Sequence, residues 1–288
     1  MTATSVAARA LACWCGGRRF APVFRYEAPP SGEVRFRFAA GKPYQREVVR
    51  CEGCGHFRSV HELDATQLYA GDYVSANYQD DEGIRRAFER IQALEPTQSD
   101  NAGRVRRILS FAEGWFGILP PAGPARSILD IGSGLCVFLA RMQSAGWAGT
   151  ALDSDERLVR HARQRVGVAA IRGGFMEVQG LGLFDAVALN KVLEHVPDPE
   201  PMLRKALAHV APGGFLYLEV PDGERAAAQG PEREEFAIDH WHVFSAASLA
   251  LLVARAGGAL QALERVRDPS GKFTLRAFAA PAILGAGA

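Results

Sequence analysis

The chain has 288 residues, of which 48% are hydrophobic and 23% charged, and its net charge is +1 at neutral pH. This composition is ordinary for a globular protein, and the length allows more than one packed unit. The charge balance leaves no basic excess for a polyanion, so nucleic acid is not an expected partner. We find no targeting segment and no apolar run of bilayer-spanning length, and we therefore expect a cytoplasmic protein without a membrane partner.

Four of the five cysteines lie within the first 54 residues, in two pairs that are each followed by glycine. Cys51 and Cys54 have the two-residue spacing of a metal knuckle, whereas Cys13 and Cys15 are one residue closer together. Alternating stretches at 34–38 and 47–50 predict short strands between the pairs. We therefore predict a zinc-ribbon-like module over residues 1–60, in which these four thiolates hold a structural zinc ion.

Other interpretations of the cysteines remain open from the sequence. Disulfides are disfavoured in a reducing cytoplasm, and four ordinary free thiols are the second alternative. Because the first pair is shortened, His56 or His61 is an alternative ligand to Cys13. A site with four protein ligands is closed, so we expect it to stabilise the fold and not to perform chemistry.

Residues 61–125 are predicted to form a helical connector that covers the active site. A helix start is predicted at 61–64, and apolar residues at helical spacing predict a helix from Asp80 to Leu94. Ser99 or Asp100 is the predicted cap of a further helix that runs to Phe116. The proline-rich stretch 120–124 then predicts a boundary.

From Ser127 onward, strand and helix signals alternate. The predicted strands are 127–131, 149–153, 168–171, 184–189, 214–220, 259–266 and 273–279, and the predicted helices are 136–145, 155–165, 200–209 and 245–256. This alternation predicts an α/β fold over residues 126–288, with a doubly wound, Rossmann-like sheet of seven strands. The link 267–272 is too short for a parallel crossover, so the last strand is predicted to be antiparallel.

The first of these strands leads into the most informative motif. Gly132 and Gly134 follow it and would let a ligand approach the main chain. About 20 residues after the turn, the next strand ends at Asp153, a position from which a carboxylate binds a ribose. The third glycine of a dinucleotide site and the lysine of a phosphate loop are both missing. The motif therefore favours an adenosine-type ligand without a pyrophosphate.

Four segments in this order (129–134, 152–155, 184–198 and 211–221) resemble class I S-adenosylmethionine-dependent methyltransferases. The preceding cysteine-rich module resembles a subset of that family, many of whose members act on sugars or on bacterial secondary metabolites. A tyrosine-rich segment, Leu68 to Tyr78, resembles one that lies at the active-site mouth in that subset. The resemblance implies S-adenosylmethionine as the cofactor, with contacts from Asp130, Gly132, Ser133, Gly134, Asp153, Ser154, Gly174, Phe175, Asn190, Lys191 and Val192.

The expected function is methyl transfer to a small polar acceptor, namely a sugar, a nucleotide-sugar or a natural-product intermediate. The chain has Cys136 where the family usually has glycine, so a catalytically weakened, cofactor-binding partner subunit is an alternative. An NAD-linked oxidoreductase is a second alternative, disfavoured by the missing third glycine. The sequence leaves open the acceptor, the atom that is methylated and the oligomeric state.

The catalytic candidates lie in the insertion 221–244, whose charged early part predicts a mobile lid. His240 and His242 are alternate residues that would share a face of an extended segment, and Asp239 would fix the tautomer of one of them. We expect one of these histidines to be the base that accepts a proton from a hydroxyl acceptor. Glu219, at the end of a predicted strand, is the next candidate for the base, and His195 is a further candidate for substrate contact.

Overall fold

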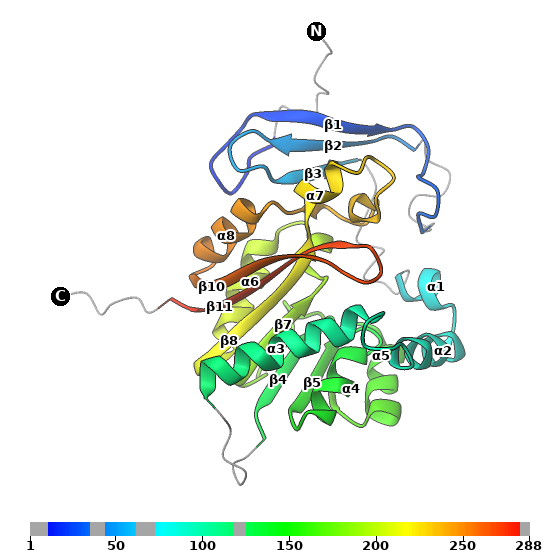
Figure 1. Cartoon of the computed structure of the whole chain (residues 1–288), viewed down its shortest axis with the longest axis vertical. Coiled ribbons are helices and arrows are strands. Elements are labelled where there is room, and N and C mark those ends of the chain that lie inside the picture. Colours follow the sequence, from blue (N-terminus) through cyan, green and yellow to red (C-terminus); the bar gives the residue numbers. More distant parts are fainter. Residues whose placement is uncertain (1–10, 35–43, 62–72, 118–124, 283–288) are drawn as a thin grey trace, which may run out of the picture.

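The computed structural model describes residues 11–34, 44–61, 73–117 and 125–282 (Figure 1). In this part of the chain there are two sheets, a small one near the N-terminus and a larger one built from residues after Ser127. The small sheet lies across one end of the larger sheet, at the top of Figure 1.

The larger sheet has seven strands in the order β10-β11-β8-β7-β4-β5-β6. Neighbouring strands from β8 to β6 pair in parallel, while β11 pairs antiparallel with both β10 and β8. The predicted α/β fold with an antiparallel last strand is therefore confirmed. The strands are β4 (Ser127–Ile131), β5 (Ala148–Asp153), β6 (Ala169–Arg172), β7 (Phe184–Asn190), β8 (Val210–Pro221), β10 (Gly258–Arg267) and β11 (Phe273–Pro281).

Both faces of this sheet are buried, which explains why its central strands are continuous apolar runs. Along β7, Val187 and Leu189 enter one core cluster, whereas Ala186 and Ala188 enter the cluster on the opposite face. Strand β8 alternates in the same way between the two clusters. Period-2 alternation therefore fixes which face each side chain covers, and the sheet edge at the carboxyl ends of the parallel strands remains for ligands.

Helices pack on the two faces of this sheet and also form the connector between the two sheets. They are α1 (Tyr73–Tyr78), α2 (Asp81–Gln92), α3 (Asp100–Phe116), α4 (Val137–Ser144), α5 (Glu156–His161) with the π-helical turn η4 (Ala162–Val166), η5 (Leu193–His195), α6 (Pro199–Ala208), α7 (Gly223–Ala227), η6 (Glu234–Phe236) and α8 (Ala246–Arg255). The predicted cap Ser99 is present, because its side chain accepts from a backbone N–H group of α3, and Asp80 caps α2 in the same way. Among the described residues, no helix is both long and apolar enough to cross a bilayer.

The N-terminal sheet has the order β1-β2-β3-β9, from β1 (Phe20–Tyr26), β2 (Arg46–Cys51), β3 (Phe57–Val60) and β9 (His242–Val243). Its fourth strand comes from the C-terminal part of the chain, and Phe57 and Arg58 pair with Val243 and His242. The predicted domain boundaries at residues 60 and 125 stay a prediction. Strand β9 lies after both boundaries in the sequence, but it belongs to the N-terminal sheet. The predicted strand 34–38, the helix start at 61–64, residues 68–72 of the tyrosine-rich segment and the break at 120–124 lie wholly or largely outside the described residues.

The charged segment 222–236, which contains the expected lid, is packed against the N-terminal sheet in this structure. Asp222 is fully buried and caps α7, and Ala226 and Phe236 pack in one cluster with Phe57 of the N-terminal sheet. A Cβ atom added at Gly223 would lie 2.5 Å from the ring of Phe57, so glycine is needed there for close packing. Burial of a few apolar side chains, which charge content alone does not reveal, holds this segment down.

The N-terminus of α8 joins the two sheets. Ser245 caps α8 in a capping box with Ser248, and its hydroxyl also donates to the carbonyl oxygen of Cys54 at 2.5 Å. The indole N–H of Trp14 donates to the carbonyl oxygen of Ser248 at 3.0 Å. One helix end therefore serves as both a cap and an anchor for the cysteine-rich segment.

We predict that Ser245→Ala lowers the free energy of unfolding by about 2–3 kcal/mol, because it removes a helix cap and a buried hydrogen bond. Ser99→Ala is the matched control, since Ser99 caps α3 without touching the N-terminal module, and it should cost about 1 kcal/mol. Urea denaturation followed by circular dichroism measures both values. Equal losses in the two variants would contradict the anchoring role of Ser245.

Candidate functional site

The glycine turn after β4 stands at the carboxyl edge of the sheet. Gly132 and Gly134 have φ angles of 68° and 51°, and the N–H groups of Gly132 and Ser133 both donate to the carbonyl oxygen of Leu152. A Cβ atom at Gly132 would lie 2.9 Å from Cγ2 of Val192. The turn therefore requires glycine at this position, both for its backbone angle and for its contact with the segment after β7.

Asp153 at the end of β5 faces this turn, as the spacing predicted. Its two carboxylate oxygens accept from the N–H of Gly134 at 2.9 Å and from the N–H of Asp155 at 3.0 Å. Burial raises the pKa of Asp153, while these two N–H groups oppose that rise. The structure thus brings Asp153, Ser133 and Gly134 together, with the exposed Ser154 beside them. A carboxylate oriented in this way offers its remaining lone pairs to a hydroxyl-bearing ligand.

The other predicted cofactor contacts divide into two kinds. Asp130 lies under the turn and accepts from Nδ2 of Asn190 at 2.8 Å, and burial raises the pKa of Asp130 to about 7. Phe175 is 4% exposed, and its side chain packs in the core. Asn190 is the last residue of β7, Lys191 and Val192 follow it, and Gly174 lies after β6, all at the same edge as the turn.

Cys136, which departs from the family pattern, has a left-handed backbone with φ of 59° and is the N-cap of α4. Glycine adopts this conformation without strain, whereas another residue loses about 1–2 kcal/mol. The thiol itself is fully buried in the core cluster with Phe138 and Met142. Because it has no exposed surface, it does not crowd a ligand at the turn, and the reason for a weakened partner subunit disappears.

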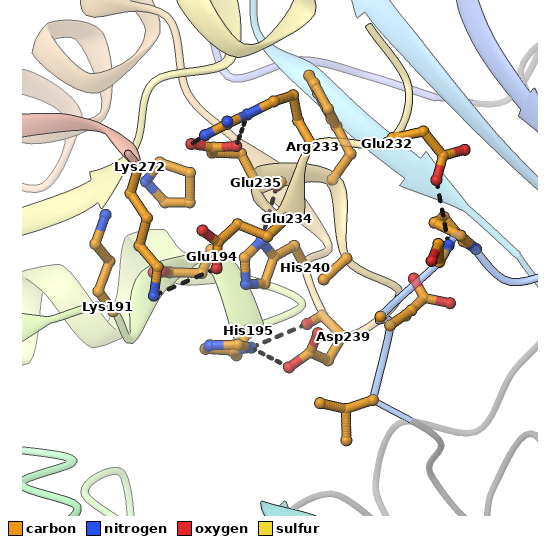
Figure 2. A pocket seen from close by; sticks show the side chains of 18 of the residues that line it. Lys191, Glu194, His195, Glu232, Arg233, Glu234, Glu235, Asp239, His240 and Lys272 are labelled. Carbon is orange, nitrogen blue, oxygen red and sulfur yellow. Dashed lines mark hydrogen bonds and ion pairs between the residues drawn. The ribbon is translucent and has the colours of Figure 1, made fainter. Parts of the chain in front are cut away.

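A pocket of about 340 Å³ lies next to the segment that follows β7 (Figure 2). Its walls are the loop 30–34 of the N-terminal module, the segment 191–195 after β7, and the segment 232–240. Val192, which packs on Gly132, belongs to the same segment as Lys191, Glu194 and His195 of the pocket wall. The pocket therefore adjoins the glycine turn, and its volume suits a small molecule.

His195 and His240 stand together in this pocket, with ring centroids 4.8 Å apart. Nδ1 of His195 lies 3.1 Å from the carbonyl oxygen of Asp239 and 3.4 Å from its carboxylate, as Figure 2 shows. Nδ1 of His240 lies 2.8 Å from the carbonyl oxygen of Glu235. Because a carbonyl oxygen only accepts, Nδ1 is the hydrogen-bond donor in both of these contacts. Burial lowers the pKa of His240, so its ring is neutral at pH 7.

Asp239 orients His195, and not His240 or His242 as the sequence suggested. His242 is fully buried outside the pocket, where its Nδ1 bonds Nε2 of His56 at 2.9 Å and its Nε2 bonds the carbonyl oxygen of Pro197 at 3.1 Å. Burial lowers the pKa of His242 to about 3. The expected shared face of the two histidines is wrong, because β9 begins only at His242 and the chain turns before it.

Glu219 is also placed away from the pocket wall. It is 1% exposed and makes a bidentate ion pair with Arg104 of α3, with distances of 2.9 and 2.5 Å, and Tyr217 donates to it at 2.8 Å. Burial favours its protonated form, but Arg104, Lys191 and Arg276 hold the pKa of Glu219 below its usual range. A carboxylate so stabilised is a poor base, so the structure disfavours that candidate role.

The sequence did not reveal the groups that hold the pocket loop in place. Glu33 of the N-terminal module accepts from the N–H of Ile238 at 2.8 Å and pairs with Arg46 at 3.1 Å. Arg46, which is 2% exposed, also donates to the carbonyl oxygen of Phe236. The contacts with Ile238 and Phe236 link residues about 200 positions apart in sequence, so no local pattern predicts them. They fix the loop that carries Asp239 and His240.

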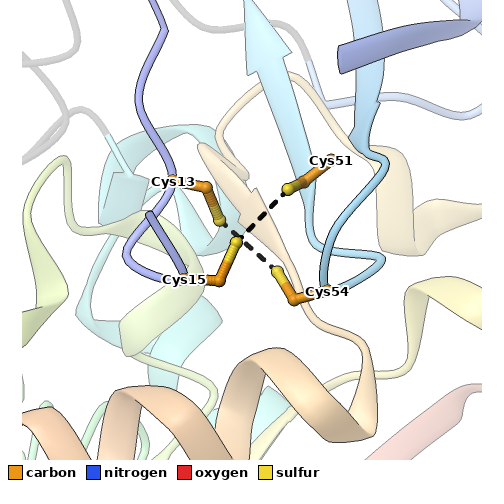
Figure 3. A group of neighbouring side chains, drawn as sticks. All are labelled: Cys13, Cys15, Cys51 and Cys54. Atoms are coloured by element: carbon orange, nitrogen blue, oxygen red, sulfur yellow. Dashed lines mark hydrogen bonds between the residues drawn. The ribbon is translucent and has the colours of Figure 1, made fainter. Parts of the chain in front are cut away.

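The four N-terminal cysteines form one cluster, with their Sγ atoms all within 4.8 Å of one another (Figure 3). Sγ of Cys13 lies 3.4 Å from that of Cys54, and Sγ of Cys15 lies 3.5 Å from that of Cys51. These distances are far longer than a disulfide bond and close to the ~3.8 Å expected between sulfurs around tetrahedral zinc. His56 bonds Ser248 and His242 and so does not replace Cys13.

Glycines leave room around this cluster. A Cβ atom at Gly17 would lie 3.1 Å from the sulfurs of both Cys15 and Cys51, and the N–H of Gly17 donates to Sγ of Cys15. Backbone donors directed at sulfur are suited to thiolates, which stay charged when a metal ion balances them. The residues present thus fit the predicted structural zinc ion, with the two knuckles supplying two ligands each.

Comparison of the sequence with known protein families identifies a methyltransferase family. The profile of a family described as "Methyltransferase domain" matches residues 80–263. The curated relatives include a ubiquinone biosynthesis O-methyltransferase of Caulobacter vibrioides, 30% identical over 141 residues, and one of Bordetella avium, 30% identical over 163 residues. These alignments cover 46% and 54% of this chain, and the chain spans only 50% and 61% of the relatives' lengths.

Among solved structures, a similar one is the 1,6-didemethyltoxoflavin-N1-methyltransferase of Burkholderia thailandensis with bound 1,6-didemethyltoxoflavin and S-adenosylhomocysteine. It is 20% identical, with a TM-score of 0.55, and the match covers 88% of this chain and 100% of that one. At this identity, the likeness supports the fold.

We predict that protein purified without chelators contains one zinc ion per chain, bound by the four clustered cysteines. Cys54→Ser should remove most of the metal and lower thermal stability, because a structural zinc contributes directly to folding. Cys136→Ala is the control, since the fifth cysteine is buried in a different cluster. Elemental analysis measures the stoichiometry. Metal-free wild-type protein, or equal zinc in Cys54→Ser and wild type, would refute the assignment.

Proposed function

Because this chain belongs to the methyltransferase domain family, we propose that it transfers the methyl group of S-adenosylmethionine to a hydroxyl of a small polar acceptor. This proposal rests on one observation, namely that a site suited to the cofactor's ribose lies next to a polar pocket suited to the acceptor. The oriented carboxylate of Asp153 at the glycine turn suits an adenosyl ribose, and the polar pocket that adjoins the turn contains two histidine rings whose Nδ1 atoms are held by backbone carbonyl oxygens. The family leaves no support for the NAD-linked oxidoreductase.

When bound, S-adenosylmethionine supplies an electrophilic methyl group on a sulfonium. The chain's part is to hold that group and the acceptor in line and to promote loss of the hydroxyl proton. Asp153 and the backbone of Gly132 to Gly134 would hold the adenosyl part. His195, whose orientation Asp239 sets, and the neutral His240 would receive the acceptor hydroxyl in the pocket.

We propose that the acceptor is a sugar, a nucleotide-sugar or a natural-product intermediate. The small, polar pocket supports this proposal, since ionised groups from three segments surround it. The curated relatives are named for ubiquinone biosynthesis and for O-methyl transfer, which supports oxygen as the methylated atom. A panel containing a hexose, a nucleotide-sugar and a phenolic diol, assayed with labelled S-adenosylmethionine, distinguishes these acceptor classes.

Binding of the cofactor is tested at Asp153. We expect Asp153→Asn and Asp153→Ala to weaken S-adenosylhomocysteine binding by about 10- to 150-fold, because a charge-assisted hydrogen bond of about 1.5–3 kcal/mol is lost. Asp155→Asn is the matched control, since that neighbouring carboxylate caps α5 and pairs with Arg157. Isothermal titration calorimetry measures the affinity. Unchanged affinity in both Asp153 variants would show that the ribose binds elsewhere.

Catalysis is tested at the histidines. We expect His195→Gln and His240→Gln each to lower turnover by about two to four orders of magnitude while S-adenosylhomocysteine affinity stays the same. His209→Gln is the control, because this histidine lies beyond α6, at the opposite end of the sheet, with Nδ1 bonded to the carbonyl oxygen of Gly182. His242→Gln should lower thermal stability, because His242 is buried and hydrogen-bonded outside the pocket. Full turnover in both pocket variants would remove the histidines from the reaction.

A further inference from the structure

The pocket contains a group of side chains that a simple proton-accepting site does not explain. Glu194, His195 and His240 can each offer one ligand atom, and these three atoms lie within 4.8 Å of one another. The three residues lie together on the pocket wall (Figure 2). The grouping joins two segments far apart in sequence, the turn η5 and the loop after η6.

Glu194 is the unusual member of this group. It is 1% exposed, and its Oε2 atom has no hydrogen-bond partner among the described residues. A buried carboxylate oxygen without a donor is costly, by several kcal/mol for a charged group. Such an atom, in a carboxylate grouped with two imidazole rings on a pocket wall, is explained if a cation occupies the space between the three side chains.

The two histidines are arranged as metal ligands usually are. Nδ1 of each ring is held by a backbone carbonyl oxygen, at 3.1 Å for His195 and 2.8 Å for His240. This contact fixes the tautomer that presents Nε2 as a donor of electrons, and it is the outer contact that metal-binding histidines generally make. The carboxylate of Asp239 adds to it at 3.4 Å from Nδ1 of His195.

The surroundings also favour a positive charge. Six carboxylates and three lysine or arginine side chains line the pocket. The carbonyl oxygen of Glu194 accepts from the N–H of Trp241 at 2.8 Å, so the two ligand-bearing segments are tied together without any ion. The site is therefore held in place by the fold and does not depend on the metal for its assembly.

We propose that Glu194, His195 and His240 bind a divalent cation that holds the acceptor's hydroxyl oxygen. This inference rests on the proposed function and identifies how the pocket receives its substrate. Two imidazoles and one carboxylate suit zinc, iron or manganese, and three protein ligands leave a position open for an oxygen of the acceptor. In this arrangement the histidines act as ligands, and the cation promotes loss of the hydroxyl proton to solvent.

The consequence for the substrate is specific. An acceptor with two neighbouring oxygens, such as a vicinal diol, would occupy two positions on the cation and be bound through both. A hydroxyl with no second oxygen beside it would bind less tightly. We therefore expect the acceptor to be a diol of either the sugar or the phenolic kind.

The test is binding of Mn²⁺ alone to the full chain, followed by electron paramagnetic resonance. Mn²⁺ favours oxygen and nitrogen ligands, so it does not compete for the four-cysteine cluster, which thiolate ligands make selective for softer ions. We expect one bound Mn²⁺ per chain, and a weakening of about tenfold or more in Glu194→Gln and in His240→Ala. His209→Ala is the control and should bind as wild type does. Circular dichroism shows whether each variant is folded.

Two results would overturn the proposal: no Mn²⁺ binding to wild type, or equal binding in wild type and a folded His240→Ala. Calorimetry with S-adenosylhomocysteine on the same samples separates this outcome from failure of the proposed function. Cofactor binding without Mn²⁺ binding rejects the cation site alone. Mn²⁺ binding at these residues without cofactor binding rejects the proposed function and leaves the cation site.

Discussion

The pairing of β3 with β9 is the constraint on which the pocket depends. Two residues from late in the chain, His242 and Val243, complete the N-terminal sheet by pairing with Phe57 and Arg58. The residues before β9 are thereby held over the pocket, and those after it form the N-terminus of α8 beneath the cysteine cluster. Glu33 and Arg46 reinforce the same segment from the other side. The pocket residue His240 and the clustered Cys54 therefore belong to a single packed unit, although they lie in different parts of the sequence.

A buried network of ion pairs attaches the helical connector to the larger sheet. Arg104 of α3 reaches Glu219 on β8, and Arg276 of β11 pairs with both Glu219 and Asp268. Each buried charge has at least one opposite charge beside it, which offsets much of the desolvation cost, and removal of one member would leave another uncompensated. The network ties the connector helix to the antiparallel hairpin. It also explains why a carboxylate at a strand end, normally a good place for chemistry, serves the structure here.

The features that sequence predicted well are those fixed by local patterns. The seven strands follow from apolar runs and alternation, and Asp153 meets Gly134 because two adjacent parallel strands end at the same edge. The histidines show where such reasoning fails. His240 and His242 would share a face only in an extended chain, and here the strand begins at the second of them. Their partners, His195 and His56, are 45 and 186 residues away, and Glu33 has no local signal at all. Tertiary contacts at that range decide the site, and a single sequence does not display them.

The late arrival of β9 has a consequence for synthesis on the ribosome. The first 60 residues emerge early, but the strand that completes their sheet lies about 180 residues further on, as the His56–His242 contact shows. At ordinary translation speeds this interval lasts on the order of ten to forty seconds. Throughout it, β3 presents an unpaired edge and apolar groups such as Phe57, features that promote association between chains. Metal capture by the two nascent knuckles would give the emerging segment a compact form before its last strand exists, so cellular zinc supply would set the yield of folded protein.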